Sequence, residues 1–297
     1  MSLENITLAN GCGEDDDREN YGGAIFNLGS LIIKRSTLRD NAATERAGAV
    51  FNNKDLVIVG STFANNQAGT WGGAILNGSA GTATISGSTF VGNEAWLGGA
   101  IFNNRTLSLS NSTLASNAGL KNGGGLYNAA NDSLDIRFST IANNIGHGLF
   151  DKGGTVVLTA SILANNSAGD CVHNNSFSGS NNMILDTDAS CGLVDGSDGN
   201  LIGVDPQLLA LTDNGGPTET LALEAGSPAI DAAGVDCPAA DQHGTRRPQG
   251  AACDIGAVEM VGLGGTAVGD NLGLLAATGG TLLVGLAGLL VWRRREG

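Results

Sequence analysis

Charged residues gather near the end of the chain in a pattern that could support acid–base chemistry. Carboxylates and arginines are interleaved there, and an arginine among carboxylates can assist proton transfer. The residues concerned are Asp241, Arg246, Arg247, Asp254 and Glu259. A second interpretation is a buried ion-pair lock, because an irregular segment has little apolar core to hold it together. We favour the lock and assign no catalytic residue.

Other side chains could bind a metal ion. An acidic run contains Asp15, Asp16 and Asp17, and hard cations such as calcium prefer several carboxylates. A solvated loop explains the same run more simply, because charge runs are commonly exposed. His147 and His173 lie near acidic residues in the sequence, and isolated surface histidines are the simpler explanation for them. We therefore expect no cofactor, with calcium as the alternative.

The cysteines indicate an exported protein. Cys171 and Cys191 close one short loop, and Cys237 and Cys253 close another, as disulfides in an oxidising compartment would. Cys12 is left over, and no pair has the Cys-x-x-Cys spacing of a zinc site. The net charge of −14 excludes nucleic acid as a partner, because phosphate binding needs clusters of lysine and arginine.

The elements that position these residues come from an eleven-residue phrase. It reads apolar, any, apolar, any, any, Ser, any, apolar, any, any, Asn, and it recurs every 22 to 27 residues. Its period-2 steps indicate strands with one buried face, and the three-residue step between the second apolar residue and Ser indicates a bend. The copies begin at Leu31, Leu56, Ala83, Leu107, Leu134 and Val156. A fixed period of this length predicts a solenoid.

A second phrase precedes each copy and predicts a third strand per coil. It reads Gly-Gly-Ala-Ile-Phe-Asn at 22–27, with echoes at 47–52, 72–77, 98–103, 123–128 and 146–151. Its glycines allow a turn with positive φ and a close approach of neighbouring coils. Three strands in about 25 residues describe one coil of a parallel β-helix, with coils about 4.8 Å apart.

Stacked coils place equivalent side chains in columns. We expect the Asn column, which begins at Asn41, to form an amide ladder at a turn, and the Ser column, which begins at Ser36, to point inward. Outward columns of Thr and of aromatic residues should alternate with buried positions. Four aromatic residues could stack on a ligand such as a sugar: Phe26, Phe51, Phe102 and Tyr127. The alternative that we favour is that these rings stack on one another.

Composition divides the chain into four parts. Residues 1–203 are the β-helix, which begins in the middle of a coil, so we expect further coils and an export signal upstream. Residues 204–259 contain all 5 prolines and should form an irregular cap over the last open coil. A Gly-rich linker follows at 260–273, and 274–297 ends in an uncharged run and arginines. That run, through 274–292, is long enough to cross a membrane as a helix.

These phrases resemble known families. The Gly-Gly-Ala-Ile-Phe-Asn and Ser-Thr-Leu phrases are similar to the right-handed, single-stranded parallel β-helix of the pectin-lyase-like superfamily and to the repeats of polymorphic outer-membrane adhesins. The motifs at 214–218, 226–231, 241–247 and 253–257 resemble those of choice-of-anchor Q proteins. The resemblance implies an all-β protein on the bacterial cell surface, carried by an interchangeable C-terminal anchor.

The tail resembles a cell-wall sorting signal of the LPXTG class. Its motif is Leu275, Ala276, Ala277, Thr278 and Gly279, with Ala276 where the commonest motif has proline. The resemblance implies that a sortase cleaves after Thr278 and joins the chain to peptidoglycan. The alternative is an uncleaved transmembrane anchor.

The expected function is therefore that of a non-enzymatic, adhesin-like protein or structural stalk on the cell surface, with a host or neighbouring cell as a possible contact. The alternatives are a polysaccharide lyase or hydrolase and a module that binds extracellular glycan. The lyase or hydrolase alternative is weaker, because no two carboxylates recur at the period that would place them across a cleft.

Overall fold

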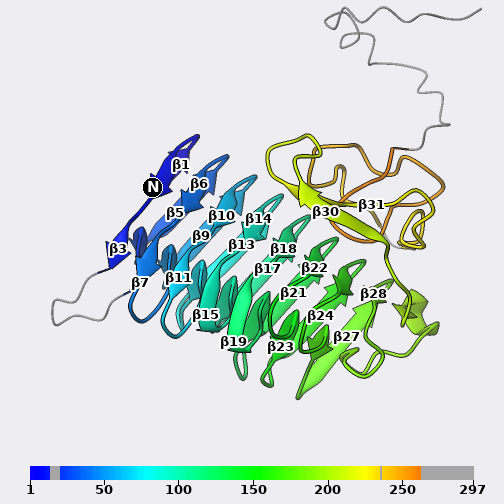
Figure 1. The fold of residues 1–297 in the computed structure, drawn as a ribbon, viewed down its shortest axis with the longest axis horizontal. Coiled ribbons are helices and arrows are strands. Elements are labelled where there is room, and N and C mark those ends of the chain that lie inside the picture. Colours follow the sequence, from blue (N-terminus) through cyan, green and yellow to red (C-terminus); the bar gives the residue numbers. More distant parts are fainter. Residues whose placement is uncertain (14–20, 235, 262–297) are drawn as a thin grey trace, which may run out of the picture. The chain divides into compact units, whose positions relative to one another are not determined.

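The chain folds as an all-β parallel solenoid. The computed structural model describes residues 1–13, 21–234 and 236–261. Figure 1 shows strands stacked coil upon coil from the N-terminus. The described residues contain one short helical turn, the 3₁₀ element η1 (Ser197–Gly199). The predicted β-helix is confirmed at the level of a parallel β-solenoid.

The eleven-residue phrase forms two parallel sheets. Sheet A comprises β1 (Ser2–Glu4), β5 (Ser30–Lys34), β9 (Asp55–Val59), β13 (Thr82–Ser86), β17 (Thr106–Ser110), β21 (Ser133–Arg137), β24 (Thr155–Thr159) and β27 (Ser176–Ser180). Sheet B comprises β2 (Thr7–Ala9), β6 (Thr37–Arg39), β10 (Thr62–Ala64), β14 (Thr89–Val91), β18 (Thr113–Ala115), β22 (Thr140–Ala142), β25 (Ile162–Ala164), β28 (Met183–Ile184) and β29 (Leu201–Ile202).

Two further sheets complete the coils. The four coils from residue 25 to residue 122 have four strands each, whereas the coils whose first strands begin at residues 126 and 149 have the predicted three. Sheet D is formed by the second phrase: β4 (Ile25–Asn27), β8 (Val50–Asn52), β12 (Ile75–Asn77), β16 (Ile101–Asn103), β20 (Leu126–Asn128), β23 (Leu149–Asp151) and β26 (Cys171–Val172). The unpredicted sheet C contains β3 (Cys12–Gly13), β7 (Ala42–Ala43), β11 (Gln67–Ala68), β15 (Glu94–Leu97) and β19 (Ala118–Asn122). Its first three strands have two residues each, too few for a recognisable alternation.

Each regular coil bends through single residues in the left-handed region. One such residue precedes the Ser column, as at Asn111 (φ 43°), and another precedes the Asn column, as at Asn65 (φ 54°). Gly and Asn adopt this conformation at low cost, which explains their frequency here. The bend that the three-residue step predicts before each Ser is therefore confirmed, and its cause is one left-handed residue between sheets A and B.

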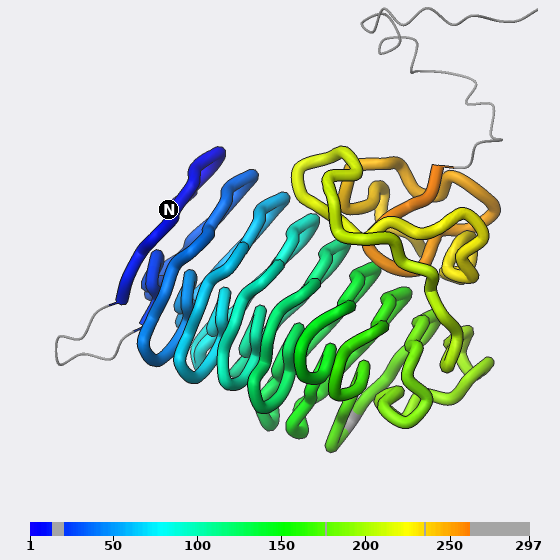
Figure 2. The backbone as a smooth tube through the Cα atoms, viewed as in Figure 1, coloured from blue at the N-terminus to red at the C-terminus, as the bar shows by residue number. Residues whose placement is uncertain are grey.

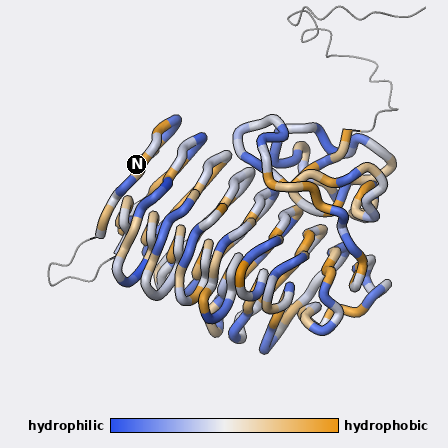
Figure 3. Tube along the Cα trace, in the orientation of Figure 1, coloured by the Kyte–Doolittle hydropathy of each residue, from blue (hydrophilic) through white to orange (hydrophobic). Residues whose placement is uncertain are grey.

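The core lies inside the coils. Equivalent residues pair in register, as Ile33 does with Ile58 in neighbouring strands of sheet A, and both are fully buried. Figure 3 shows apolar and polar residues alternating along the coils. Sheet B contributes a stacked pair, Phe63 and Phe90, whose ring centroids lie 4.8 Å apart. Because each inward side chain packs on its counterparts above and below, no coil buries its apolar face alone.

The Asn column forms the expected amide ladder. Each side-chain Nδ2 donates to Oδ1 of the Asn in the next coil, at 2.9–3.0 Å, from Asn41 through Asn166. The Ser column also points inward: each Ser amide before Ser161 donates to the next Ser hydroxyl, as from Ser61 to Ser88 at 3.1 Å. Both predictions are confirmed, and both columns satisfy buried polar groups in every coil.

A second amide ladder was not predicted. It runs along the ends of the sheet D strands, with Nδ2 to Oδ1 distances of 2.7–2.8 Å, through Asn27, Asn52, Asn77, Asn103 and Asn128 to Asp151. These residues end the second sequence phrase, so the phrase encodes a ladder as well as a strand.

The segment after the coils, here called the flank segment (204–234 and 236–261), does not lie across the last coil as expected. It packs on the outer face of sheet B, beside the coils, as Figure 2 shows in yellow and orange. Apolar side chains from both parts meet there, including Ile162 and Met183 from the coils and Leu221 and Ile255 from the flank segment. The outward column of sheet B changes from Thr to these apolar residues, so this face, and not the open end, offers the apolar surface to bury.

The flank segment has one small sheet and is otherwise irregular. Its antiparallel pair is β30 (Leu208–Thr212) and β31 (Thr220–Leu223). Both predicted disulfides are present: Cys171–Cys191 near the end of the coils and Cys237–Cys253 in the flank segment. Cys12 lies in β3.

The predicted linker from residue 262 onward and the predicted anchor at 274–297 lie outside the described residues. Within the described ranges, no helix is long and apolar enough to span a membrane.

Candidate functional site

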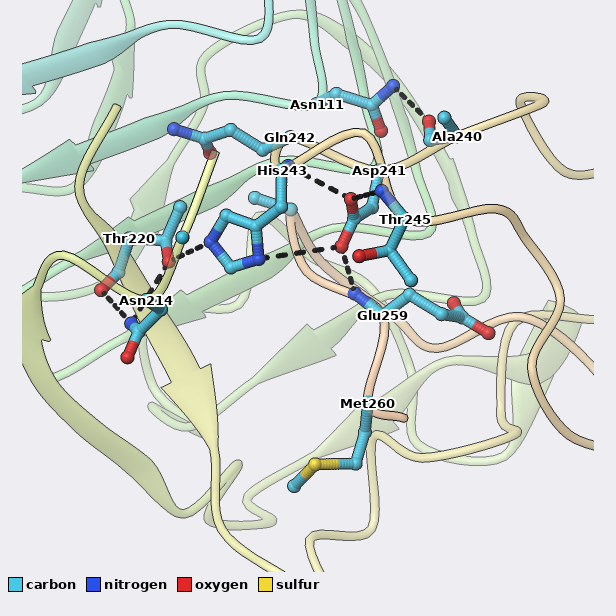
Figure 4. A network of polar contacts seen from close by, with 12 residues as sticks. Asn111, Asn214, Thr220, Ala240, Asp241, Gln242, His243, Thr245, Glu259 and Met260 are labelled. Carbon is cyan, nitrogen blue, oxygen red and sulfur yellow. Dashed lines mark hydrogen bonds and ion pairs between the residues drawn. The ribbon is translucent and has the colours of Figure 1, made fainter. Parts of the chain in front are cut away.

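The charged residues that could do chemistry lie in the flank segment, and Asp241 is at their centre. Its Oδ1 accepts hydrogen bonds from the amides of His243 (2.9 Å) and Thr245 (2.8 Å). Its Oδ2 accepts from the amide of Glu259 at 2.8 Å (Figure 4). The carboxylate is buried and ties a turn to the last described residues of the segment. These three hydrogen bonds to the carboxylate of Asp241 therefore all come from main-chain amides.

His243 joins Asp241 to Thr220, a contact that the sequence did not reveal. Its Nε2 lies 2.6 Å from the Thr220 hydroxyl, and its Nδ1 lies 3.8 Å from Asp241 Oδ2 (Figure 4). Burial lowers the pKa of His243, opposed by the charges of Asp241 and Asp213, so the imidazole is neutral near pH 7. Asn214 Nδ2 also donates to the Thr220 hydroxyl at 3.1 Å.

The order hydroxyl, imidazole, carboxylate is that of a nucleophile activated by a base. Thr220 is fully buried, so its hydroxyl does not meet solvent or a substrate. The chain of contacts instead connects β31 to the turn at Asp241. The histidine inside the motif at 241–247 was the one available sequence signal for this contact.

Arg247 and Glu259 form a buried ion pair, with Nη1 to Oε2 at 3.1 Å and at most 1% of either side chain exposed. Arg247 also donates to the carbonyl oxygens of Asp254 and Gly256, each at 2.7 Å. Its guanidinium lies 4.9 Å from the Phe138 ring of the coils. Burial lowers the pKa of Arg247, and the charges of Glu259, Asp241 and Asp254 oppose that shift. The pair thus fixes the flank segment to itself and to a bend of the solenoid.

Asp254 completes this buried group. Its Oδ1 accepts from the amide of Asp231 at 2.8 Å, and its Oδ2 from the amide of Met260 at 2.6 Å. Burial raises the pKa of Asp254 to about 6. The structure therefore brings together four of the five residues named from sequence, around main-chain amides and carbonyls. The fifth, Arg246, is exposed.

Gln242 was not recognised in the sequence, and it connects the flank segment to the coils. Its Nε2 donates to the hydroxyls of Thr89 (2.8 Å) and Thr218 (2.9 Å), and its Oε1 accepts from the hydroxyl of Thr113 at 2.7 Å. Thr89 and Thr113 are outward residues of the Thr column, in strands β14 and β18. The buried side-chain amide of Gln242 thus bonds to two adjacent coils at once.

A groove lies between the coils and the flank segment. Its volume is about 730 Å³. Equivalent positions at the ends of four successive sheet A strands contribute to it, together with a wall at Asp236–Pro238. The coil residues are Ser110, Asn111, Arg137, Phe138, Thr159 and Ser180. Three hydroxyls and one guanidinium therefore lie in a row along the coil axis, separated by the spacing of the coils.

The aromatic residues proposed for ligand stacking lie outside the solenoid on sheet D, and their faces lie against one another. Phe26 and Phe51 stack with centroids 4.9 Å apart, as do Phe102 and Tyr127. Phe102 and Tyr127 are each only 5% exposed, whereas Phe26 is 51% exposed. A sugar stacks on a free ring face, and most faces in this column are occupied by neighbours. This geometry matches the self-stacking interpretation.

A second layer covers part of that column. Arg46 lies between Tyr21 and Trp71, with its guanidinium carbon 4.9 Å and 4.2 Å from the two ring centroids. Trp71 in turn stacks on Phe102, at 5.1 Å between centroids. These contacts make the outer face of sheet D a packed minor core.

The remaining candidates are few. Asp15, Asp16 and Asp17, and the motif at 275–279, lie outside the described residues. Across the described ranges, no three His, Cys, Asp or Glu side chains gather in a metal-binding group. His147 lies at a tilt against Phe150, with centroids 5.3 Å apart, and burial lowers its pKa. His173 Nδ1 lies 3.2 Å from the carbonyl oxygen of Asn175.

In comparisons with known proteins, no family model, no curated protein and no solved structure matches the chain.

Proposed function

We propose that this chain is a non-enzymatic β-solenoid that serves as an adhesin-like or structural stalk on a bacterial cell surface. The observation that carries the proposal is how the acid–base residues are used. Asp241, Asp254 and Glu259 accept main-chain amides, and Arg247 donates to main-chain carbonyls. Groups bound in this way hold a fold together and leave no free acid or base to act on a substrate.

The two disulfides support this proposal. Two disulfides belong in an oxidising compartment, and a stack of coils held by repeated ladders is a stiff element suited to displaying a surface. Attachment would come from the tail, where Leu275–Gly279 resembles a sortase signal and the following uncharged run resembles a membrane stop. Sortase and peptidoglycan are then the partners, with an uncleaved membrane anchor as the alternative.

Two experiments test this proposal. Incubation of the purified chain with polyuronates and neutral glycans should release no unsaturated or reducing ends, and clear turnover would refute the non-enzymatic role. Mass spectrometry of cell-wall digests should find a peptide that ends at Thr278 linked to peptidoglycan. A Thr278→Ala variant should lose that product. An intact tail in the membrane fraction of the unmodified protein would refute sortase attachment.

A second candidate function is glycan binding in the groove beside the flank segment. Hydroxyls of Ser110, Thr159 and Ser180 recur along it with the Arg137 guanidinium, and a polymer with repeated hydroxyls could follow them. Binding on a glycan array that is lost in Thr159→Val but kept in Phe102→Leu would favour the groove. The reverse result would favour the aromatic column, and the absence of binding would remove both.

A further inference from the structure

The column of rings on the outer face of sheet D is interrupted at one coil. Leu76 pairs in register with Phe51 in the preceding coil and with Phe102 in the next, so a leucine occupies a place that rings occupy on either side. Among the described residues, the rings that stack on Phe51 are Tyr21 and Phe26, both from the coil before it. The face of Phe51 toward Leu76 therefore has no ring against it.

The first coil of the column shows what fills this space elsewhere. Tyr21 and Phe26 lie side by side there, with centroids 6.3 Å apart, and each stacks on Phe51 at 4.9 Å. The face of sheet D thus has room for two rings in one coil. The coil of Leu76 supplies one ring, Trp71, which stacks on Phe102 at 5.1 Å. The place of the second ring is left to the smaller side chain of Leu76.

A cation without an anionic partner lies beside this gap. Tyr21, Arg46 and Trp71 follow one another in register in successive coils, and the guanidinium of Arg46 lies over both rings. Nη1 of Arg46 donates to the Tyr21 hydroxyl. No ion pair in the described ranges includes Arg46. Because a guanidinium has five N–H donors, most of those of Arg46 remain for a ligand.

The gap and the cation line the same cavity, whose volume is about 210 Å³. Its lining comes from three successive coils centred on that of Leu76, and it includes Phe51, Trp71, Leu76, Arg46, Asn53 and Asn104. Asn53 Oδ1 accepts from the amide of Ala80 at 3.1 Å, which leaves Nδ2 of Asn53 as a donor. Apolar walls with a few polar groups are typical of small-molecule sites, and a cavity below about 300 Å³ suits a ligand of about one ring.

We propose that this cavity binds a small aromatic carboxylate, with its ring against Phe51 and Leu76 and its carboxylate on Arg46. The ring takes the place of the ring that the column lacks, where offset stacking is favoured. The carboxylate provides the charge-assisted hydrogen bonds that the Arg46 guanidinium does not make within the described residues. None of these residues belongs to the flank segment, and the site goes beyond the proposed stalk function without depending on it.

The test is a ligand-observed NMR titration of the full chain with benzoate. One equivalent should bind with a Kd on the order of 1 mM or tighter, as expected for so small a ligand. Benzyl alcohol keeps the ring but lacks the charge, so it should bind about tenfold more weakly. Glucuronate keeps the charge but has no flat ring, and it should also bind about tenfold more weakly. No binding of benzoate, or equal binding of either comparison compound, would overturn the proposal.

Leu76→Phe is the sharpest variant because it completes the ring column. The first coil holds Phe26 beside Tyr21, so a phenylalanine at position 76 should fit beside Trp71. This variant should keep or raise the melting temperature and weaken benzoate binding by about tenfold or more, since its ring fills the cavity. Benzoate binding that survives unchanged in Leu76→Phe would place the ligand elsewhere and refute the site.

Arg46→Gln tests the charge separately from the fold. It should remove the preference for benzoate over benzyl alcohol, a ratio that a purely structural role of Arg46 would leave unchanged. Arg39→Gln is the matched control, because Arg39 is an exposed arginine of β6 in sheet B and should keep both the affinity and the preference. A preference that persists in Arg46→Gln would show that Arg46 does not bind the carboxylate.

Discussion

The coils and the flank segment satisfy their buried polar groups in opposite ways. In the coils, a polar side chain bonds to its own counterpart one coil away, as Asn66 does to Asn93 at 2.9 Å. In the flank segment, each bond joins different residues, such as Arg247 to Glu259 or Gln242 to Thr113. The same requirement, that buried polar groups be paired, is met by repetition in one region and by unique partners in the other.

This difference determines where stability is located. The coils spread it over many similar contacts, so neighbouring coils support one another. The flank segment concentrates it in a few residues and in the disulfide Cys237–Cys253, which spans 16 residues. Single substitutions should therefore act cooperatively in the coils and locally in the flank segment.

The largest effect is expected from breaking a ladder in the middle of the coils. Asn93 donates to the Phe63 carbonyl and to Asn117, and it accepts from the amide and side chain of Asn66. Each buried group left unpaired costs about 1–3 kcal/mol, so Asn93→Ala should lower the free energy of unfolding by about 4 kcal/mol or more. Urea denaturation followed by circular dichroism measures this loss.

A nearby asparagine provides the control for that variant. Asn104 is partly exposed, and Asn104→Ala should change the free energy of unfolding by no more than about 0.5 kcal/mol. A loss of less than about 1 kcal/mol in Asn93→Ala would mean that the ladder is not a main source of stability in the coils.

The next largest effect is expected from the buried ion pair. Arg247→Met leaves Glu259 buried without its partner, which typically costs about 3–5 kcal/mol. Amide hydrogen exchange should show loss of protection in the flank segment while sheet A stays protected. Arg137→Met removes an exposed pair with Asp135 and should cost at most about 1 kcal/mol. Equal loss of protection in both regions would contradict local release.

The coils could be predicted from the sequence because the same solution recurs in every coil. Ile33 and Ile58 identify the buried face by repetition, and the step to Ser36 identifies the bend. Even so, the second ladder was missed, because Asn27 and its equivalents were interpreted as the end of a strand phrase. The available signal was a repeated polar residue two positions after a buried apolar residue, and so on the same, inward face of the strand.

The flank segment could not be placed in this way. Gln242 bonds to Thr113 and Thr89, which lie 129 and 153 residues away in the chain, and no local pattern encodes such contacts. The ion-pair lock was the favoured interpretation because the residue types were suggestive, but the partners of Asp241 are main-chain amides. The one sequence signal for the buried face was the change from Thr140 to Ile162 in the outward column.

A smaller effect is expected at the contact between the two regions. Gln242→Ala removes one hydrogen bond from each of three buried hydroxyls, and this should cost about 1–3 kcal/mol. Faster proteolysis of the flank segment, with the coils intact, would report its detachment. Gln249→Ala is the control: among the described residues, that exposed side chain bonds to the Arg246 carbonyl alone. Proteolysis at the same rate in both variants would refute this role of Gln242.

The last effect is a dependence on pH to which Asp254 of the flank segment contributes. Burial raises the pKa of Asp254 in the folded chain to about 6, above the value of about 3.9 for an unfolded aspartate. The folded state therefore holds this proton more tightly, so its stabilising contribution is complete below pH 4 and is lost as the pH rises through about 6. The free energy of unfolding, measured in urea between pH 4 and 7, should fall less steeply in Asp254→Asn than in the unmodified chain. Asp132 titrates in the same window in both proteins, so the difference between them isolates Asp254.

Asp188→Asn, a change of one charge in an exposed turn, should leave the slope unchanged. An unaltered slope in Asp254→Asn would show that the main-chain amides of Asp231 and Met260 keep this carboxylate ionised throughout the window.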